Sequence, residues 1–169
     1  MEFKKYNHLE EEKKISDFWI KKGSFKPKKG KLKNTFSIVI PPPNVTGRLH
    51  MGHALNNSLQ DVLVRFNRMK GNETLWQPGT DHAGIATQAV VEKNLKEKGI
   101  KKNELGREKF IKKVWDWKKD SGGIILDQLK KLGWSCDGSR TRFTMDKDLS
   151  KAVIKVFVDL YNKKLIYKD

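Results

Sequence analysis

Two histidines set three residues apart are the side chains in this sequence best suited to chemistry on a polyphosphate. His50 and His53 flank Met51-Gly52, and the apolar pattern that follows predicts a helix beginning at about Leu49. Residues three apart share one face of a helix. Both imidazoles would lie beside the unpaired backbone N–H groups of a helix N-terminus, where the helix dipole favours negative charge. Gly52 has no Cβ, so a flat or bulky ligand could approach the backbone there.

A plainer alternative has one histidine capping the helix, the other at the surface and Gly52 as a turn residue. For an isolated His-x-x-His pair we would prefer that alternative. The local context favours a ligand site, because the pair follows an expected strand and a rigid turn, the setting that a phosphate-binding motif requires. The sequence therefore predicts a nucleotide site at His50 and His53.

Three elements would position this pair. The run from Phe36 to Ile40 has the composition of a strand buried in a sheet. Pro41 to Pro43 then fix φ and remove backbone donors, so strand pairing cannot continue. The helix would run about six turns to Gly71, with apolar residues at spacings of three and four: Leu55, Leu59, Val62, Leu63, Phe66 and Met69.

A carboxylate follows the second expected strand. Glu73 to Gln77 is a strand candidate ended by Pro78-Gly79, so Asp81 would lie where open α/β sheets bind ligands. A carboxylate there could pair with an amine. The alternative is that Asp81 or Thr80 caps the helix expected from Gly84 to Lys98, and the residues alone leave both interpretations open.

The alternation of strands and helices indicates an α/β fold with parallel strands. Only two strands are strongly indicated, so the chain would hold the first half of such a sheet. Before these strands we expect a helix near Leu9 to Lys21. After them we expect helices from Arg107 to Lys119 and from Gly122 to Leu132, which are either separate or one helix interrupted at Ser121-Gly122-Gly123. The last expected elements are an extended segment from Arg142 to Asp146 and an amphipathic helix from Leu149 to Lys163.

Composition sets wider limits on function. The 36 Lys and Arg residues against 20 Asp and Glu give a formal net charge of +16, which is consistent with a nucleic-acid partner but does not locate it. The one cysteine, Cys136, excludes an intramolecular disulfide and a cysteine-based zinc site. No apolar run approaches the roughly twenty residues that span a membrane, and no signal-type region follows Met1. We expect a cytoplasmic protein without a membrane partner.

The stretch from Pro41 to Leu55 resembles the nucleotide-binding signature of class I aminoacyl-tRNA synthetases, with His50-Met51-Gly52-His53 as the signature tetrapeptide. Its wider context is similar to the valyl, isoleucyl and leucyl members. Gly79 to Gln88 resembles the form particular to the valyl-tRNA synthetases. Further similar stretches are Trp115 to Lys118, Gly122 to Gln128 and Phe143 to Asp146, so the resemblance covers almost the whole chain.

The resemblance implies the first half of a Rossmann-like catalytic domain over residues 35–169, preceded by a helical extension over residues 1–34. It implies a valine–tRNA ligase that uses ATP with Mg²⁺ to form valyl-adenylate and esterifies the 3'-terminal adenosine of tRNA(Val). His50 and His53 would be catalytic and bind ATP together with Gly52. Pro41, Asn44 and Asp81 would hold L-valine, with Asp81 on the ammonium group. No metal site is implied within the chain, and the role of His82 is left open.

Two departures from the family pattern bear on activity. The family's Lys-Met-Ser-Lys-Ser type loop is absent, and the last residues resemble the segment before the inserted editing domain. We therefore expect an N-terminal fragment, weak or inactive alone, whose partner is the remaining C-terminal part of the synthetase. The alternative is a non-catalytic basic RNA-binding or interaction module derived from a synthetase. Gly138 also stands where the family usually has Trp, and Trp134 could fill that space.

Overall fold

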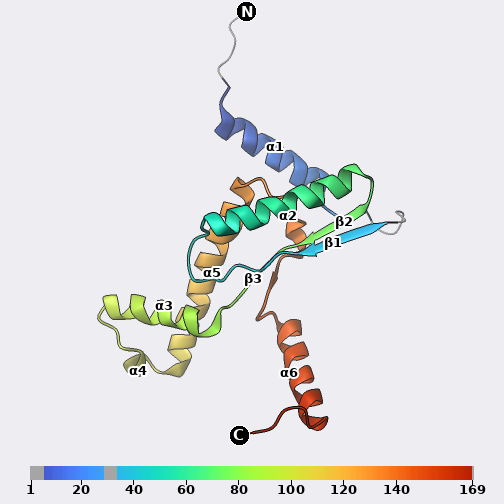
Figure 1. Ribbon diagram of the computed structural model, residues 1–169. Helices are drawn as coiled ribbons and strands as arrows, with labels where there is room; N and C mark the ends of the chain where they lie inside the picture. The colour runs from blue at the N-terminus through green and yellow to red at the C-terminus, as the bar shows by residue number, and fades with distance from the viewer. Residues whose placement is uncertain (1–5, 29–33, 169) are drawn as a thin grey trace, which may run out of the picture. The chain divides into compact units, whose positions relative to one another are not determined.

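The computed structural model describes residues 6–28 and 34–168 of the chain. Helices and strands are mixed along the chain, both strand pairs are parallel (Figure 1), and a helix comes first. This confirms the predicted α/β class with an N-terminal helix. The described residues form two compact units that are interleaved along the chain, and each is described here by itself. The predicted division between residues 34 and 35 stays a prediction.

The first unit is built on a two-stranded parallel sheet. Strand β1 (Thr35–Val39) pairs with β2 (Glu73–Gln77) in a register that sets Thr35 beside Glu73. Helix α2 (Met51–Met69) lies over this sheet (Figure 1), and α1 (His8–Lys22) belongs to the same unit. Pairing of β1 ends when Ile40 donates its N–H to Gln77 O at 3.0 Å. The prolines that follow have no N–H to donate, as predicted.

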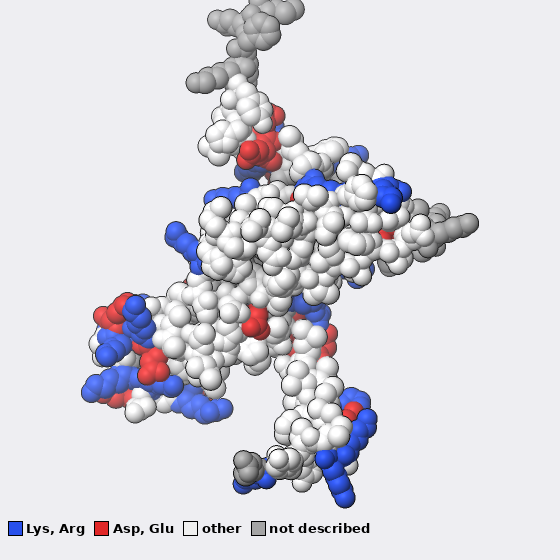
Figure 2. Space-filling view, in the orientation of Figure 1, with Lys and Arg blue, Asp and Glu red and all other residues white. Residues whose placement is uncertain are grey.

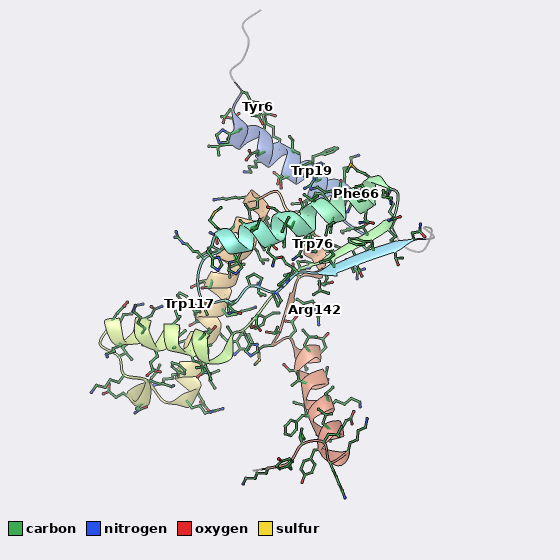
Figure 3. The ribbon with its side chains drawn as sticks, in the orientation of Figure 1. Tyr6, Trp19, Phe66, Trp76, Trp117 and Arg142 are labelled. Atoms are coloured by element: carbon green, nitrogen blue, oxygen red, sulfur yellow. The ribbon has the colours of Figure 1, made fainter. Side chains whose placement is uncertain are left out.

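The core of the first unit lies around Trp76 of β2 (Figure 3). Its indole is fully buried, and Nε1 donates to Oε1 of Gln60 on α2 at 2.9 Å. The ring of Trp134 meets it edge-on, with the centroids 6.3 Å apart. Further buried side chains are Ile40, Val64, Ile125 and Leu129, the last two from the C-terminal part of α5 (Arg107–Lys131).

A polar face joins α2 to the turn after α5. Asp61 Oδ1 accepts the Ser135 N–H at 3.0 Å, and Arg65 Nη2 donates to Gly133 O at 2.7 Å. Arg68 donates to both Ser135 Oγ and Ser135 O at 2.6 Å. These bonds satisfy the polar groups of Ser135, which is completely buried. The turn continues to a short 3-10 helix, Gly138–Arg140.

The apolar stripe that predicted α2 does not face this core. Each of its members is more than half exposed: Leu55, Leu59, Val62, Leu63, Phe66 and Met69. The face that packs inward instead carries Asn57, Gln60 and Val64. Strand β1 is likewise less buried than its composition predicts, with Val39 72% exposed. Periodicity identifies the helix and its faces. The face that packs is determined by hydrogen bonds that Asp61 accepts from Ser135 and that Arg68 donates to it.

The second unit contains a shorter parallel pair and several helices. Strand β3 (Gly79–Thr80) pairs with β4 (Arg142–Phe143). Around this pair the chain forms α3 (Gly84–Glu97), α4 (Lys102–Leu105), the first part of α5, up to Gly122, and α6 (Lys147–Asn162). Val91, Leu95 and Phe110 form a buried cluster with Leu105, Val114 and Trp117 packed against it.

The structure corrects the expected break in one C-terminal helix and adds a finding on the other. Helix α5 is continuous through Ser121-Gly122-Gly123, because two glycines lower helix propensity without removing any backbone donor. Helix α6 is amphipathic as predicted but buries none of its residues, so its apolar side is exposed at Val153, Val156 and Phe157. None of the helices in the described part of the chain is long and apolar enough to cross a membrane.

Candidate functional site

The two predicted histidines lie at the start of α2 and cap it. His50 is the N-cap residue, with an extended backbone, and its Nδ1 accepts the Gly52 N–H at 3.1 Å. His53 Nδ1 accepts the His50 N–H at 3.3 Å. The two rings are 3.9 Å apart between centroids. This reciprocal pair is a capping box made of imidazoles, in which two backbone donors are satisfied.

Capping determines what the imidazoles can offer a ligand. A nitrogen that accepts a hydrogen bond carries no proton, so each neutral ring has its N–H at Nε2. Neither Nε2 has a hydrogen-bond partner among the residues that the structure describes. The pKa of His53 lies below its ordinary value of 6.5, first because of desolvation and then because of His50. Both histidines therefore cap the helix, whereas the alternative had only one of them as a cap and Gly52 in a turn. The Nε2–H donors remain for the predicted ligand role, which stays a prediction.

Gly52 has a local reason to lack a side chain. A Cβ at this position would lie 3.0 Å from Cε1 and 3.1 Å from Nδ1 of His50. Such a contact is tighter than most van der Waals contacts, so the imidazole would have to shift by a few tenths of an ångström. The glycine therefore makes room for the cap, in addition to the predicted approach of a ligand.

Gln128 fixes the approach to α2. Its Oε1 accepts the N–H of Leu49 at 2.9 Å, in a partly buried position. Leu49 directly precedes the histidine cap, so this bond holds the chain where the helix begins. The Gly122 to Gln128 stretch stood out in the sequence as a family match, but nothing in its pattern indicated this role.

In the second unit the structure brings Asn44 and Asp81 together. Asp81 N donates to Pro43 O and Asp81 O accepts from Val45 N, both at 2.9 Å. These bonds set Asn44 and Asp81 side by side as a parallel bridge. Asn44 is exposed and Asp81 is half-buried. Asn44 and Asp81, both predicted to contact an amino-acid substrate, are thus neighbours.

The Asp81 carboxylate does not cap a helix. The N-cap of α3 is Ala83, with a φ of 46°, and no side chain caps it. Asp81 Oδ1 instead accepts a hydrogen bond from Thr144 Oγ1 at 2.8 Å. The capping alternative for Asp81 and Thr80 is therefore wrong, which leaves the ligand interpretation of Asp81 open to test.

His82 contacts the same threonine. Its backbone N–H donates to Thr144 Oγ1 at 2.9 Å, and its Nδ1 lies 2.6 Å from the same oxygen. Nδ1 is also 3.3 Å from Asp81 Oδ1. Thr144 was not among the predicted site residues. The sequence did contain one signal, the resemblance to the family from Phe143 to Asp146, but that resemblance assigned no role to Thr144.

A cavity of about 780 Å³ lies in the second unit beside His82. Its walls are mainly apolar, with aromatic rings from Phe110, Trp115 and Phe143. Lys118, also in the wall, places Nζ 4.3 Å from the centre of the Phe143 ring. The volume is in the range of small-molecule pockets, and the sequence patterns did not predict it.

The remaining predicted residues are placed as follows. Pro41 is exposed and belongs to the first unit with His50, Gly52 and His53. Asn44 and Asp81 belong to the second unit. Across the described residues, no three His, Cys, Asp or Glu side chains are grouped so that they could hold a metal ion.

Comparison with known proteins decides the family. Residues 14–169 match the family described as tRNA synthetases class I (I, L, M and V). The chain belongs to this family. The matched residues of this class I synthetase include both the histidine cap of α2 and the segment around Asp81. Both groups of predicted site residues therefore lie within the family match.

Similar proteins give more detail. The valine–tRNA ligase of Pelagibacter ubique (strain HTCC1062) is 68% identical over 165 residues, which are 98% of this chain and 19% of that ligase. The valine–tRNA ligase of Syntrophotalea carbinolica is 60% identical over 98% of this chain and 18% of its own length. The synthetase chain therefore spans about a fifth of the length of the curated relatives it matches.

A solved structure supports the fold. The LeuRS of Agrobacterium radiobacter K84, in a ternary complex with tRNA and LeuAMS, superposes with a TM-score of 0.79 at 23% identity. The match covers 98% of this synthetase chain and 19% of that chain. At that identity the likeness concerns the fold alone.

The departure at Gly138 leaves open space. A Cβ built there would meet no atom within 4 Å. Trp134 packs against Trp76 in the core of the first unit. The synthetase chain thus has room for a Cβ at residue 138.

Proposed function

We propose that the protein carrying this sequence is a valine–tRNA ligase. It activates L-valine with ATP to give valyl-adenylate and pyrophosphate, and then transfers the valyl group to the 3'-terminal adenosine of tRNA(Val). The observation that carries this proposal is the 68% identity to a valine–tRNA ligase over 98% of the chain. Because the chain spans 19% of that ligase, residues outside it would complete the active site.

In the first step the valine carboxylate attacks the α-phosphate of ATP, and pyrophosphate leaves. Such a transfer depends on donors that hold the phosphates and stabilise developing charge. The Nε2–H groups of His50 and His53 would supply two donors, next to the N-terminus of a 19-residue helix. Gly52 would leave the backbone open beside the adenosine. Mg²⁺ would enter with ATP as part of the substrate.

Valine would be held by the segments around Asn44 and Asp81. The Asp81 carboxylate accepts one hydrogen bond at Oδ1, so Oδ2 is available to the substrate's ammonium group. Asn44 is exposed beside it, and with Pro41 it would form part of the wall around the amino acid. In these roles Asp81 would use its Oδ2, not the oxygen that is already hydrogen-bonded to Thr144.

The partner in the second step would be tRNA(Val), and the reaction would take place in the cytoplasm. A net charge of +16 favours contact with the phosphate backbone of RNA. On the face shown in Figure 2, Lys and Arg side chains lie over α3, α4 and α6 of the second unit, with Asp and Glu among them over α3 and α4. A basic RNA-binding module without catalysis would explain the charge, but not the identity to ligases.

The test is valine-dependent ATP–pyrophosphate exchange by the protein at its natural length. The informative variant is His50→Asn with His53→Gln, since Asn and Gln keep the acceptors of the capping box while displacing the ring donors. We expect exchange to fall by about 100-fold or more. His8→Asn, on the exposed start of α1, is the matched control and should exchange normally.

Two results are decisive: the first contradicts the proposed ligase, and the second contradicts only the role of the histidines. One is a wild-type protein whose exchange does not depend on valine. The other is full exchange by the double variant, which would remove the histidines from the ATP site while leaving the family assignment intact.

A further inference from the structure

We infer that Thr144 is a positioning residue for Asp81, holding its carboxylate in the orientation that receives the ammonium group of the amino-acid substrate. The inference rests on the proposed function and adds a residue that the predicted site did not include. It also gives His82, whose role was open, a place in the same network.

The backbone brings Thr144 to this position. Strand β4 pairs with β3, which sets Phe143 beside Thr80, and Thr144 N donates to Thr80 O at 3.2 Å. The hydroxyl then lies 2.8 Å from Asp81 Oδ1. Asp81 is itself held by main-chain bonds on both sides, to Pro43 and Val45. Both partners of the contact are therefore anchored by backbone pairing rather than by flexible loops.

Counting protons determines the direction of each bond. A threonine hydroxyl carries one hydrogen, and here its oxygen is close to three groups: the Asp81 carboxylate, the His82 N–H and the His82 ring. The ionised carboxylate only accepts, so the single hydrogen goes to Asp81. The backbone N–H of His82 donates to the oxygen. Nδ1, at 2.6 Å, must therefore donate as well, so this nitrogen of His82 carries a hydrogen.

This network leaves one oxygen of the carboxylate free. Oδ1 is bound by Thr144 and lies 3.3 Å from His82 Nδ1. Oδ2 has no hydrogen-bond partner among the residues that the structure describes. A carboxylate that is hydrogen-bonded at one oxygen cannot rotate freely. Its second oxygen therefore keeps one orientation, in which it can accept a hydrogen bond from an ammonium group. Without the hydroxyl, part of the binding energy would be spent on ordering the carboxylate.

The first test is carried out on the protein at its natural length and compares two ligands. Thr144→Val removes the hydroxyl and keeps the shape of the side chain. L-valine carries the ammonium group, whereas the α-hydroxy acid with the same carbon skeleton does not. We expect Thr144→Val to weaken L-valine binding by roughly 10- to 100-fold, and binding of the hydroxy acid by less than about threefold.

The conservative variant Thr144→Ser keeps the hydroxyl and should restore the wild-type preference for L-valine. Equal losses for both ligands in Thr144→Val would show a merely structural role and would overturn the inference. An unchanged affinity for L-valine would overturn it as well.

A second measurement needs no variant at Thr144. Nitrogen NMR of the wild-type protein with ¹⁵N-labelled histidine reports the tautomer of each ring, and His82→Asn identifies the His82 signals by their loss. The Nδ1–H form is expected. The Nε2–H form would show that the Thr144 hydrogen is donated to the ring, which overturns the inference. Absence of valine-dependent exchange in the wild type would contradict the proposed function without changing this tautomer.

Discussion

Gln128 accepts a hydrogen bond from the backbone N–H of Leu49, with 2.9 Å between Oε1 and N. The two residues are 79 positions apart in the chain, and the bond ties α5 to the segment that leads into the histidine cap. An unsatisfied N–H in a partly buried place destabilises a fold by about 1–3 kcal/mol.

We therefore expect Gln128→Met to lower the free energy of unfolding by about 1–2 kcal/mol, measured by urea denaturation. Gln128→Glu keeps an acceptor oxygen and should preserve most of the stability. Gln88→Met provides a matched control, because Gln88 is exposed on α3. Equal stability of the Gln128→Met and Gln88→Met variants would show that the bond contributes nothing.

The histidine cap should loosen in acid. The pKa of His53 is lowered below 6.5 by desolvation and by His50, so the unfolded state binds more protons than the folded state once the pH falls below that value. The free energy of unfolding is therefore highest above about pH 6.5 and decreases as the pH falls. Protonation at Nδ1 would also remove the acceptor of the His50 N–H.

Urea midpoints measured between about pH 7.5 and pH 5.5 would detect this dependence. His53→Gln keeps the acceptor and cannot be protonated in this range, so its profile should be flatter than that of the wild type. His8→Gln should not alter the wild-type profile, because His8 is exposed. A slope that persists unchanged in His53→Gln would assign the effect to other groups.

Arg68 should contribute more to stability than Lys70, the exposed residue that directly follows α2. It donates twice to Ser135, and its guanidinium lies 5.3 Å from the centre of the Phe25 ring. Arg68→Met would leave the buried polar groups of Ser135 with fewer partners, at a cost of about 2–4 kcal/mol. Lys70→Met, at the exposed end of α2, should change the free energy of unfolding by less than about 0.5 kcal/mol. Similar losses in the two variants would contradict this expectation.

The Cys136 thiol should resist alkylation in the folded protein. It is 4% exposed, and burial raises its pKa above the ordinary value, aided by Asp61 and Asp137 and opposed by Arg68. Little thiolate forms near neutral pH, and reagent access is blocked. Peptide mapping by mass spectrometry after maleimide treatment should find residue 136 unlabelled until urea unfolds the protein.

A positive control for the labelling is Ser58→Cys, at an exposed position of α2. The thiol of the Ser58→Cys variant should be alkylated rapidly without urea. Comparable labelling rates at the two positions would show that the core around residue 136 opens readily.

Local patterns predicted the elements well because they depend on neighbouring residues. Strand β2 has the predicted bounds, Glu73–Gln77, and α3 begins at Gly84 as predicted. Helix α2 begins at Met51 rather than Leu49, since the His50 side chain caps the helix and its backbone is extended. The difference comes from an imidazole acting as a cap, a role that is more typical of Ser, Thr, Asp and Asn.

The contacts that build the site could not be predicted in the same way. Thr144 and Asp81 are 63 positions apart, and their contact depends on the pairing of two strands of two residues each. Neither periodicity nor composition encodes that pairing. The pattern also failed to predict which face of α2 packs inward. An apolar stripe indicates a buried face, but the contacts that hold α2 in place are polar ones made by Arg68 and Asp61.

Main-chain hydrogen bonds join two segments of the chain at Asp81: Asp81 N donates to Pro43 O, and Val45 N donates to Asp81 O. Every amino acid offers the same carbonyl, and every one except proline offers the same N–H. Mutation can therefore exchange the side chains at positions 44 and 81 while the path of the backbone is inherited unchanged. A lineage could shift its choice of ligand at this place without first evolving a new fold.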